Sequence, residues 1–282
     1  MTPDLDAVLD AADATLGAGE VRAPAGPLRV GIDLGTAYTV LAVTDDTGAP
    51  VAGGYRRGRV VRDGVVVDFA GACALVRDLK AEVEARLGTE LLAAAACHPP
   101  GVGRGEVQAV RYVVESAGME CTDLVDEPTA ANAVLSIADG AVVDVGGGTT
   151  GLALFVDGEV ARTVDEPTGG THLDLVIAGA LGISVEEAER RKTDPAEQAR
   201  LLPLVRPVLE KIGSIVGAHI AGERVASIHL VGGTSAFPGI AEAVTAQAGV
   251  PAAVPGTPLF VTPLGVARLA APAADHVIAR VH

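Results

Sequence analysis

The sequence has few of the residues that mark disulfide-bonded, zinc-binding or base-stacking proteins. It contains no tryptophan, and aromatic residues make up 2% of its 282 residues. Its three cysteines, Cys73, Cys97 and Cys121, are far apart and form no C-x-x-C pair, and no two histidines have H-x-x-x-H spacing. A disulfide framework, a structural metal and recognition by aromatic stacking are therefore not expected.

Positive charge and long apolar runs are also scarce. Lys and Arg number 21 against 36 Asp and Glu, a formal net charge of −15 that would repel DNA, RNA and anionic lipid. The basic cluster Arg56, Arg57, Arg59 and Arg62 is interpreted as a solvated strand face. No stretch of 18 apolar residues occurs, and the N-terminus is acidic. The sequence predicts a cytoplasmic protein with no nucleic-acid or membrane partner.

The apolar residues, 49% of the chain, follow alternating strand and helix patterns. From residue 28 the pattern predicts hairpins, with turns at Asp46-Thr47-Gly48 and Asp63-Gly64. A helix over 75–87 ends at Gly88. Later segments alternate, with strands at 91–97, 123–125 and 141–145 and helices at 107–117 and from 129. The fold class predicted is α/β.

Residues 1–17 form a separate feature, a short acidic amphipathic helix. Its apolar stripe consists of Leu5, Val8, Leu9, Ala12 and Leu16. A Gly- and Pro-rich stretch typical of a linker follows the helix. Docking on its own domain and binding to another protein need the same stripe, so both interpretations remain open. We expect the linker to make the helix detachable, with residues 1–19 binding a partner.

An internal repeat is the most informative feature of the sequence. The segment 30–36 is similar to the segment 142–149. Each is followed by an apolar return strand and a turn. Asp33 and Asp144 occupy matching places 111 residues apart. The repeat predicts two related α/β domains.

The two repeated loops suit phosphate binding. A glycine turn between strands leaves backbone N–H groups open to phosphate oxygens, and a following Thr adds a hydroxyl. The Asp before each turn would repel phosphate unless a divalent cation, usually Mg²⁺, lay between them. Gly146, Gly148 and Gly151 fit G-x-G-x-x-G, but the predicted hairpin after them excludes a dinucleotide fold. The loops therefore predict a Mg-nucleotide clamp.

Five motifs in order resemble those of the actin, Hsp70 and sugar kinase ATPase superfamily. The two loops resemble its phosphate motifs, and residues 125–131 and 262–267 are similar to its two connecting helices. Leu230 to Ser235 resembles its adenosine motif. The resemblance implies two actin-like (ribonuclease H-like) ATPase domains with ATP in an interdomain cleft.

Within that superfamily the chain resembles the EutJ family of chaperone-like ethanolamine utilization proteins, found with bacterial microcompartments. Segments 61–69, 99–101, 115–118 and 169–172 carry this narrower match. It implies an N-terminal helix and linker at 1–27, domain I at 28–140 with a C-terminal helix at 261–282, and domain II at 141–260. It also implies cytoplasmic or microcompartment-associated localisation.

The resemblance also implies the roles of individual residues. Asp33 and Asp144 would orient Mg²⁺ through water, with Glu127 as a further group around the metal. The residues that would hold the phosphates are Gly35, Thr36, Gly146, Gly147, Gly148 and Thr149. Gly232, Gly233 and Thr234 would border the adenosine.

Three further residues have two interpretations each. Glu189 and Lys192 match the place from which relatives contact ribose and base, but they also fit a solvated i,i+3 ion pair. Glu106 lies where bacterial actin-like proteins position the attacking water. It equally fits an acidic residue in a first helical turn, stabilised by the helix dipole.

The resemblance implies a chaperone-like, ATP-dependent assembly or reactivation factor for a microcompartment or its lyase. Its partners would be ATP or ADP and a protein of the ethanolamine pathway. A small-molecule kinase and a non-hydrolysing nucleotide-binding scaffold are the alternatives. No Lys lies between Asp33 and Lys80 to contact phosphate as in Hsp70 chaperones, so a weak Mg-dependent ATPase is the most activity expected. The 31 residues that separate Thr36 from Val67 disfavour a filament.

Overall fold

The computed structural model describes residues 5–271, which fall into two compact units. Unit 1 contains the chain up to Ser136 and again from Phe260, and unit 2 contains Ile137–Leu259. The sequence predicts the same change of domain near 140 and 260 but sets the N-terminal segment apart, whereas this segment belongs to unit 1. Of the C-terminal helix expected at 261–282, residues 272–282 lie outside the described residues, as do residues 1–4.

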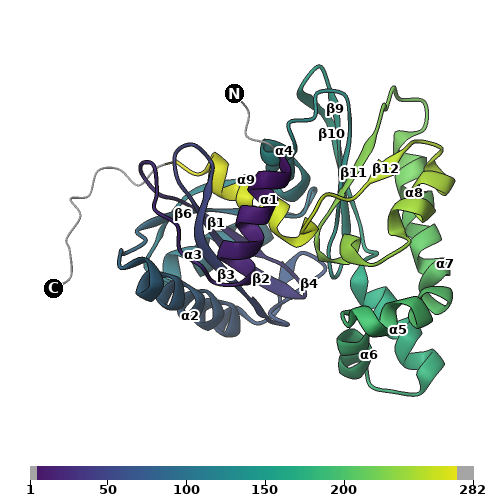
Figure 1. Cartoon of the computed structure of the whole chain (residues 1–282), viewed down its shortest axis with the longest axis horizontal. Helices are drawn as coiled ribbons and strands as arrows, with labels where there is room; N and C mark the ends of the chain where they lie inside the picture. Colours follow the sequence, from purple (N-terminus) through teal and green to yellow (C-terminus); the bar gives the residue numbers. More distant parts are fainter. Residues whose placement is uncertain (1–4, 272–282) are drawn as a thin grey trace. The chain divides into compact units, whose positions relative to one another are not determined.

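Unit 1 is built on a five-stranded mixed sheet in the order β3-β2-β1-β6-β7 (Figure 1). Its strands are β1 (Arg29–Leu34), β2 (Tyr38–Thr44), β3 (Pro50–Arg57), β6 (Ala93–His98) and β7 (Glu120–Asp126). The first three form an antiparallel meander, while β6 and β7 run parallel to β1. The mixed sheet, with helices between its parallel strands, confirms the α/β class.

The segment at 60–69 is less regular than the sequence predicts. Only the short strands β4 (Val61–Arg62) and β5 (Val65–Val66) form, and they pair with each other as a hairpin separate from the main sheet. Asp63 and Gly64 make its turn with φ of 49° and 77°. Two successive positive φ values match the twist of a tight hairpin, which explains the Asp-Gly pair.

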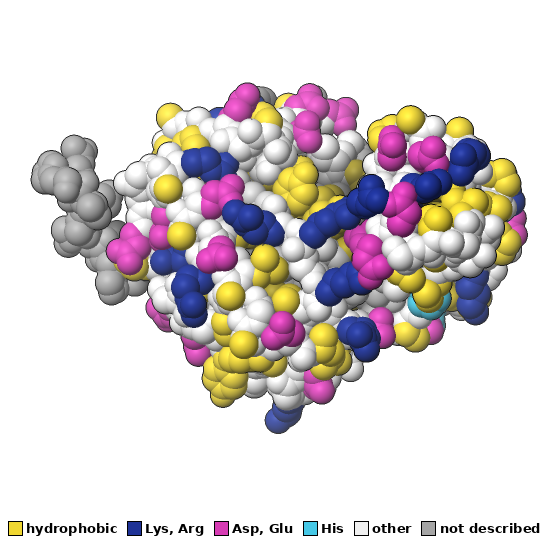
Figure 2. All heavy atoms as spheres, turned by 90° about the horizontal axis from the view of Figure 1, so that it is seen from below, with side chains coloured by type: hydrophobic (Ala, Val, Ile, Leu, Met, Phe, Trp, Pro, Cys, Tyr) yellow, Lys and Arg dark blue, Asp and Glu magenta, His cyan; other side chains and the backbone are white. Residues whose placement is uncertain are grey.

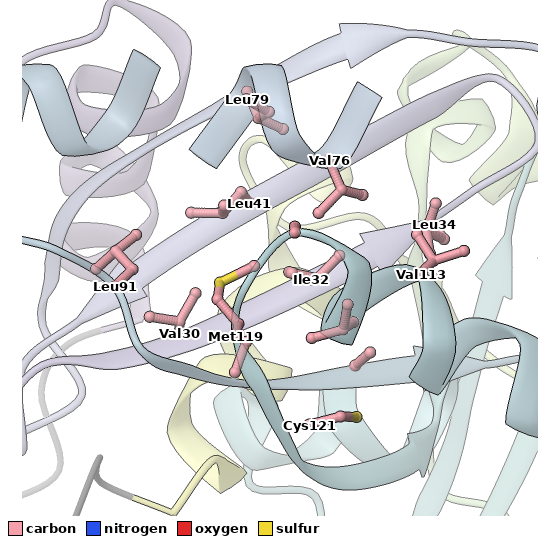
Figure 3. Close-up of a cluster of buried hydrophobic side chains, with 14 of the residues drawn as sticks. Val30, Ile32, Leu34, Leu41, Val76, Leu79, Leu91, Val113, Met119 and Cys121 are labelled. Carbon is pink, nitrogen blue, oxygen red and sulfur yellow. The ribbon is translucent and has the colours of Figure 1, made fainter. Parts of the chain in front are cut away.

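Helices α2 (Phe69–Leu87) and α3 (Arg104–Ser116) cover one face of this sheet. Alternate residues of β1 point to that face, so Val30, Ile32 and Leu34 pack with Val76 and other apolar side chains of the helices (Figure 3). α2 ends where Gly88 adopts φ 66°, as the glycine stop predicts.

The opposite face is covered by α4 (Glu127–Leu135) and α9 (Val261–Leu269), which approach unusually closely. A Cβ on Gly265 would lie 1.7 Å from the carbonyl oxygen of Ala130, and one on Gly31 would lie 2.3 Å from the backbone nitrogen of Ala267. Backbone therefore packs on backbone, and glycine is required at both positions. This close packing fixes α4 against the ends of β6 and β7.

The N-terminal segment docks on its own unit, which is one of the two interpretations that the sequence leaves open. It comprises α1 (Leu5–Ala12) and a wider turn η1 (Asp13–Gly17), which lie against β3 (Figure 1). Leu9 and Leu16 are each 2% exposed. Arg86 of α2 donates to the carbonyl oxygens of Gly19 and Gly53, which ties the linker down as well. The apolar stripe is satisfied within the molecule.

Unit 2 repeats the sheet of unit 1 in the order β10-β9-β8-β11-β12. Its strands are β8 (Gly140–Val145), β9 (Thr150–Val156), β10 (Glu159–Glu166), β11 (Ile228–Val231) and β12 (Ala252–Ala253). β8 and β9 are antiparallel, and β11 runs parallel to β8. The hairpin after Gly146 excludes a dinucleotide-binding helix there, as predicted. The two related domains inferred from the internal repeat are confirmed as matching sheets.

The helices of unit 2 include α7 (Pro195–Ile220), which has 26 residues and is longer than any described helix of unit 1. They are α5 (Gly170–Leu181), α6 (Val185–Lys192), α7 and α8 (Ile240–Ala248), with short turns η2 (Gly233–Ala236) and η3 (Pro258–Phe260), the last at the boundary of the units. Leu201, Val205, Leu209 and Ile212 of α7 are at most 1% exposed and fill the core over β8 and β9. α7 contains Pro203 and Pro207, which lack the N–H that an interior helical position normally donates.

Charged side chains of both signs are spread over one face of the molecule. Acidic and basic side chains are interspersed on the face drawn in Figure 2. Among the described residues, no helix combines the length and apolar character needed to cross a bilayer.

Candidate functional site

The first repeated loop lies between β1 and β2 of unit 1. The N–H of Gly35 donates to the carbonyl oxygen of Tyr38 at 2.9 Å and closes the turn. A Cβ on Gly35 would lie 2.7 Å from the same oxygen, so the turn requires glycine. Thr36 lies in this turn and is half-buried. The loop therefore presents backbone and a hydroxyl, with no bulky side chain at Gly35.

Asp33 lies beside Cys97 and Glu127, which come from the next two strands of the sheet. β1 pairs with β6 at Ile32 and Ala96, so the following residues, Asp33 and Cys97, leave adjacent strands on the same face. Glu127 follows β7 directly as the first residue of α4. One ligand atom from each of the three side chains lies within 4.8 Å of the other two. The sequence predicts roles for Asp33 and Glu127 here but none for Cys97.

The second loop lies between β8 and β9 of unit 2 and has the same turn. The N–H of Gly146 donates to the carbonyl oxygen of Thr149 at 3.0 Å. Asp144, two residues earlier, is 6% exposed. A Cβ on Gly232 would lie 2.2 Å from Oδ1 of Asp144, and Gly232 has φ 84°. Gly232 therefore lets the end of β11 pass directly over the carboxylate.

Three donors brace the carbonyl side of the second loop. The N–H of Gly170 and the hydroxyl of Thr234 both donate to the carbonyl oxygen of Gly146, at 2.9 and 2.8 Å. The N–H of Thr171 donates to that of Gly147 at 2.8 Å. With the carbonyls engaged in this way, the loop is held in one conformation. The sequence predicts Thr234 for this site but no role for Gly170. The Gly-Gly pair at 169–170, at the start of a helix, is the signal that indicates close backbone packing.

Lys192 reaches the same region from α6 and pairs with Asp174. The Nζ atom lies 2.8 Å from Oδ1 of Asp174 and donates to the carbonyl oxygen of Gly170 at 3.0 Å. The side chains of Lys192 and Asp174 are only 12% and 8% exposed. Lys192 is thus a largely buried cation at the N-terminus of α5, where it pairs with Asp174. Glu189 is half-buried on the same helix.

Glu106 lies in the first turn of α3, apart from the cluster around Asp33. It is half-buried, and its carboxylate is close to Gly103, where an added Cβ would lie 2.5 Å from Oε2. An acidic side chain over the N-terminal turn is stabilised by the helix dipole. This placement agrees with the structural interpretation and leaves the catalytic one as a proposal.

The two sets of residues suit a hard cation and phosphate. Asp33 and Glu127 supply two neighbouring carboxylates, the ligand type that Mg²⁺ prefers while it keeps several of its waters. In unit 2, the loop 146–149 offers a glycine-rich backbone beside Asp144, with the buried cation of Lys192 nearby. Each unit by itself therefore carries an acidic residue next to a glycine turn whose backbone can bind phosphate oxygens.

The chain is similar in sequence to proteins of known families. Residues 141–277 match the family "Cell division protein FtsA", and residues 55–181 match the family "MreB/Mbl protein". The ethanolamine utilization protein EutJ of Escherichia coli K12 is 41% identical over 242 residues, 86% of this chain and 85% of that protein.

Two solved structures are similar in fold. The crystal structure of EutJ from Carboxydothermus hydrogenoformans has a TM-score of 0.89 and 45% identity, covering 94% of this chain and 97% of that one. MreB5 of Spiroplasma citri bound to AMPPNP has a TM-score of 0.67 at 16% identity, covering 86% and 95%. The last likeness shows the fold alone. On these findings the chain belongs to the EutJ family of ethanolamine utilization proteins, within the actin-like ATPase superfamily.

Proposed function

We propose that the chain binds Mg-ATP and works as a chaperone-like assembly or reactivation factor for an ethanolamine-utilization microcompartment or its lyase. The observation that carries the proposal is the duplicated loop. Asp33 and Asp144 pair with Val40 and Gly151 in identical hairpin registers, and each hairpin turns on the same glycine hydrogen bond. A turn needed only to connect two strands has no reason to repeat an Asp two residues before its glycine.

In this proposal different residues bind different parts of the nucleotide. Asp33, Asp144 and Glu127 orient the hydrated Mg²⁺. The phosphates are held by Gly35, Thr36, Gly146, Gly147, Gly148 and Thr149. Gly232, Gly233 and Thr234 border the adenosine, with Glu189 and Lys192 of α6 on the same side. Bound Mg-ATP supplies a γ-phosphoryl group for slow hydrolysis, and Glu106 positions the water.

Two kinds of similar protein support this function. AMPPNP is bound by MreB5, whose fold this chain shares. The ethanolamine context comes from the EutJ relatives. ATP binding that draws the two units together would give a partner protein a state to recognise, which is how an assembly factor uses nucleotide.

Calorimetry with Mg-ATP on the full chain tests the proposal. We expect a dissociation constant in the micromolar range or tighter, because the loops are already formed, and this value corresponds to about −8 kcal/mol. Asp144→Asn should weaken the dependence on Mg²⁺. Glu159→Gln, an exposed change on β10 of the same unit, is the matched control. Absence of nucleotide binding by the wild-type chain overturns the proposal.

Phosphate release then separates turnover from binding alone. Glu106→Ala should slow release with little change in ATP affinity, because a residue that positions water acts in the transition state. Glu115→Ala on the same helix is the control. Release that is stimulated by a microcompartment lyase supports the assembly role. ADP formation that a small-molecule acceptor stimulates without release of free phosphate would identify a kinase instead.

A further inference from the structure

The cluster of Asp33, Cys97 and Glu127 contains a thiol that a magnesium site does not need. Mg²⁺ takes oxygen ligands, and a sulfur atom beside them adds nothing to its binding. Cys97 is nevertheless 2% exposed, and its Sγ is one of the three ligand atoms that lie within 4.8 Å of one another. The mixture of two carboxylates and one thiol is instead the donor set of a softer divalent cation.

We propose that Asp33, Cys97 and Glu127 form a site for a thiophilic divalent cation of the zinc type, bound directly through the Cys97 sulfur. The inference deepens the proposed nucleotide site, since it shares Asp33 and Glu127 with it, but it requires no nucleotide. A cation held here would occupy the carboxylates that Mg-ATP needs. The site would therefore make nucleotide binding sensitive to such a cation.

The distances bring this donor set close to coordination. Bonds of about 2.3 Å to sulfur and about 2.1 Å to oxygen place the ligand atoms of a tetrahedral zinc-type ion roughly 3.4–3.6 Å apart. The three atoms lie within 4.8 Å of one another. Metal binding therefore draws them together by at most about 1.4 Å. The flexible Glu127 side chain, at the start of α4, can supply most of that movement.

The surroundings supply both an anchor and an entrance. The Cys97 thiol lies near the carbonyl oxygen of Ile32 at 3.8 Å, which orients the sulfur on the face shared with Asp33. Asp33 and Glu127 are half-buried, so solvent reaches the carboxylates while the sulfur stays buried. Because thiolate is the ligand, the thiol proton leaves to solvent as the metal–sulfur bond forms. Water completes the coordination.

The second repeat provides an internal comparison. Ile32 pairs with Ala96 as Val143 pairs with Leu230, so Val231 takes in unit 2 the place that Cys97 takes beside Asp33. Val231 pairs with Asp144 directly. The equivalent position of the second sheet is therefore occupied by an apolar side chain. The fold does not require a thiol at Cys97.

Cadmium titration of the reduced, metal-free full chain tests the site, because a thiolate–cadmium bond gives an ultraviolet charge-transfer absorption. We expect the wild type to show this band at one equivalent of Cd²⁺. Cys97→Val, which copies unit 2, should lose the band and bind Cd²⁺ at least tenfold more weakly. Cys73→Ser and Cys121→Ser, the other two free cysteines, should keep the band. Circular dichroism checks that each variant is folded.

Glu127→Gln gives a second test that leaves the sulfur in place. The Glu127→Gln variant should keep the charge-transfer band. It should bind Cd²⁺ roughly tenfold more weakly, because one of the three proposed ligands loses its negative charge. A band that survives Cys97→Val, or a folded wild type without a band, overturns the inference. Calorimetry with Mg-ATP on the same protein tests the proposed function separately, so cadmium binding without nucleotide binding would refute that function and leave this inference standing.

Discussion

The two units share one framework but support their loops in different ways. In unit 2 the loop is braced from behind, where Gly170, Thr171 and Thr234 donate to its carbonyl oxygens. In unit 1 the residues around Asp33 are placed by helix packing, because α4 carries Glu127 and is held by the close contact of Ala130 with Gly265 of α9. The comparison shows that a duplicated hairpin fixes the position of the Asp, while later elements decide which groups surround it.

The difference extends to the size of the side chains that do the packing. Around α4 and α9, small residues let backbones touch, and Ala130, Val266 and Ala267 are fully buried. In unit 2 the core under α7 is filled by Leu, Ile and Val. The α4–α9 packing of unit 1 therefore tolerates added volume poorly, whereas the core under α7 of unit 2 is sensitive chiefly to lost volume.

The strongest test of this difference is Gly265→Ala. The new methyl group would overlap the Ala130 carbonyl, so α4 and α9 must separate, and we expect a loss of about 3 kcal/mol or more in the free energy of unfolding. Gly179→Ala is the matched control, because Gly179 lies in α5 of unit 2 with no atom within 4 Å of the added Cβ. That change should stabilise the protein by roughly 0.5–1 kcal/mol. Urea denaturation measures both, and equal effects would contradict the comparison.

A second test concerns the N-terminal helix, which unit 2 lacks. Leu9 is 2% exposed, so Leu9→Ala should lower the free energy of unfolding by about 2–4 kcal/mol through lost burial and a cavity. Asp10→Ala, an exposed change on the same helix, should alter it by less than about 0.5 kcal/mol. Urea denaturation of both variants gives the answer. An unchanged free energy of unfolding in Leu9→Ala would indicate that the helix is detachable.

Local sequence signals predicted the hairpins and helix ends well. Asp-Gly pairs and Gly88 require backbone conformations that few other residues adopt, so their effect is readable without knowledge of the fold. The repeat, with both loops at the same offset, likewise predicted two matching sheets. Signals of this kind depend on near neighbours in the chain.

Long-range partners were not predictable in the same way. The Lys192–Asp174 pair joins α6 to α5, and the place of Cys97 beside Asp33 depends on the parallel register of β1 and β6. The docking of Leu16 depends on Gly53 of β3, whose missing side chain makes room for it. The amphipathic stripe showed that the helix needed a partner surface but carried no information about which one.

A smaller effect is expected from the brace of the second loop. Thr234→Val keeps the shape of the side chain but removes the hydroxyl that donates to Gly146, a loss of about 1 kcal/mol. If the loop binds phosphate as proposed, ATP affinity should fall roughly fivefold, since 1 kcal/mol corresponds to about that factor. Thr234→Ser retains the hydroxyl and should bind nearly as the wild type. Calorimetry compares the three proteins, and identical affinities would show that the brace is not needed for binding.

The smallest effect concerns pH and the segment that links the N-terminal helix to unit 1. Burial would raise the pKa of the Asp45 carboxyl, but hydrogen bonds from the Thr47 side chain and from the N–H groups of Ala25, Ala49 and Thr47 together lower it. A carboxyl whose folded pKa lies below its unfolded pKa of about 3.9 contributes stability above that pH and loses it as the pH falls through the folded pKa.

Asp45→Asn should therefore be less stable than the wild type near neutral pH, and the difference should shrink as the medium is acidified through that range. Thr47→Val, which removes one donor, should show part of the same effect. Urea denaturation at a series of pH values measures this difference. A gap between Asp45→Asn and wild type that stayed constant down to the lowest pH would mean that the Asp45 carboxylate holds the linker through shape and not through its charge.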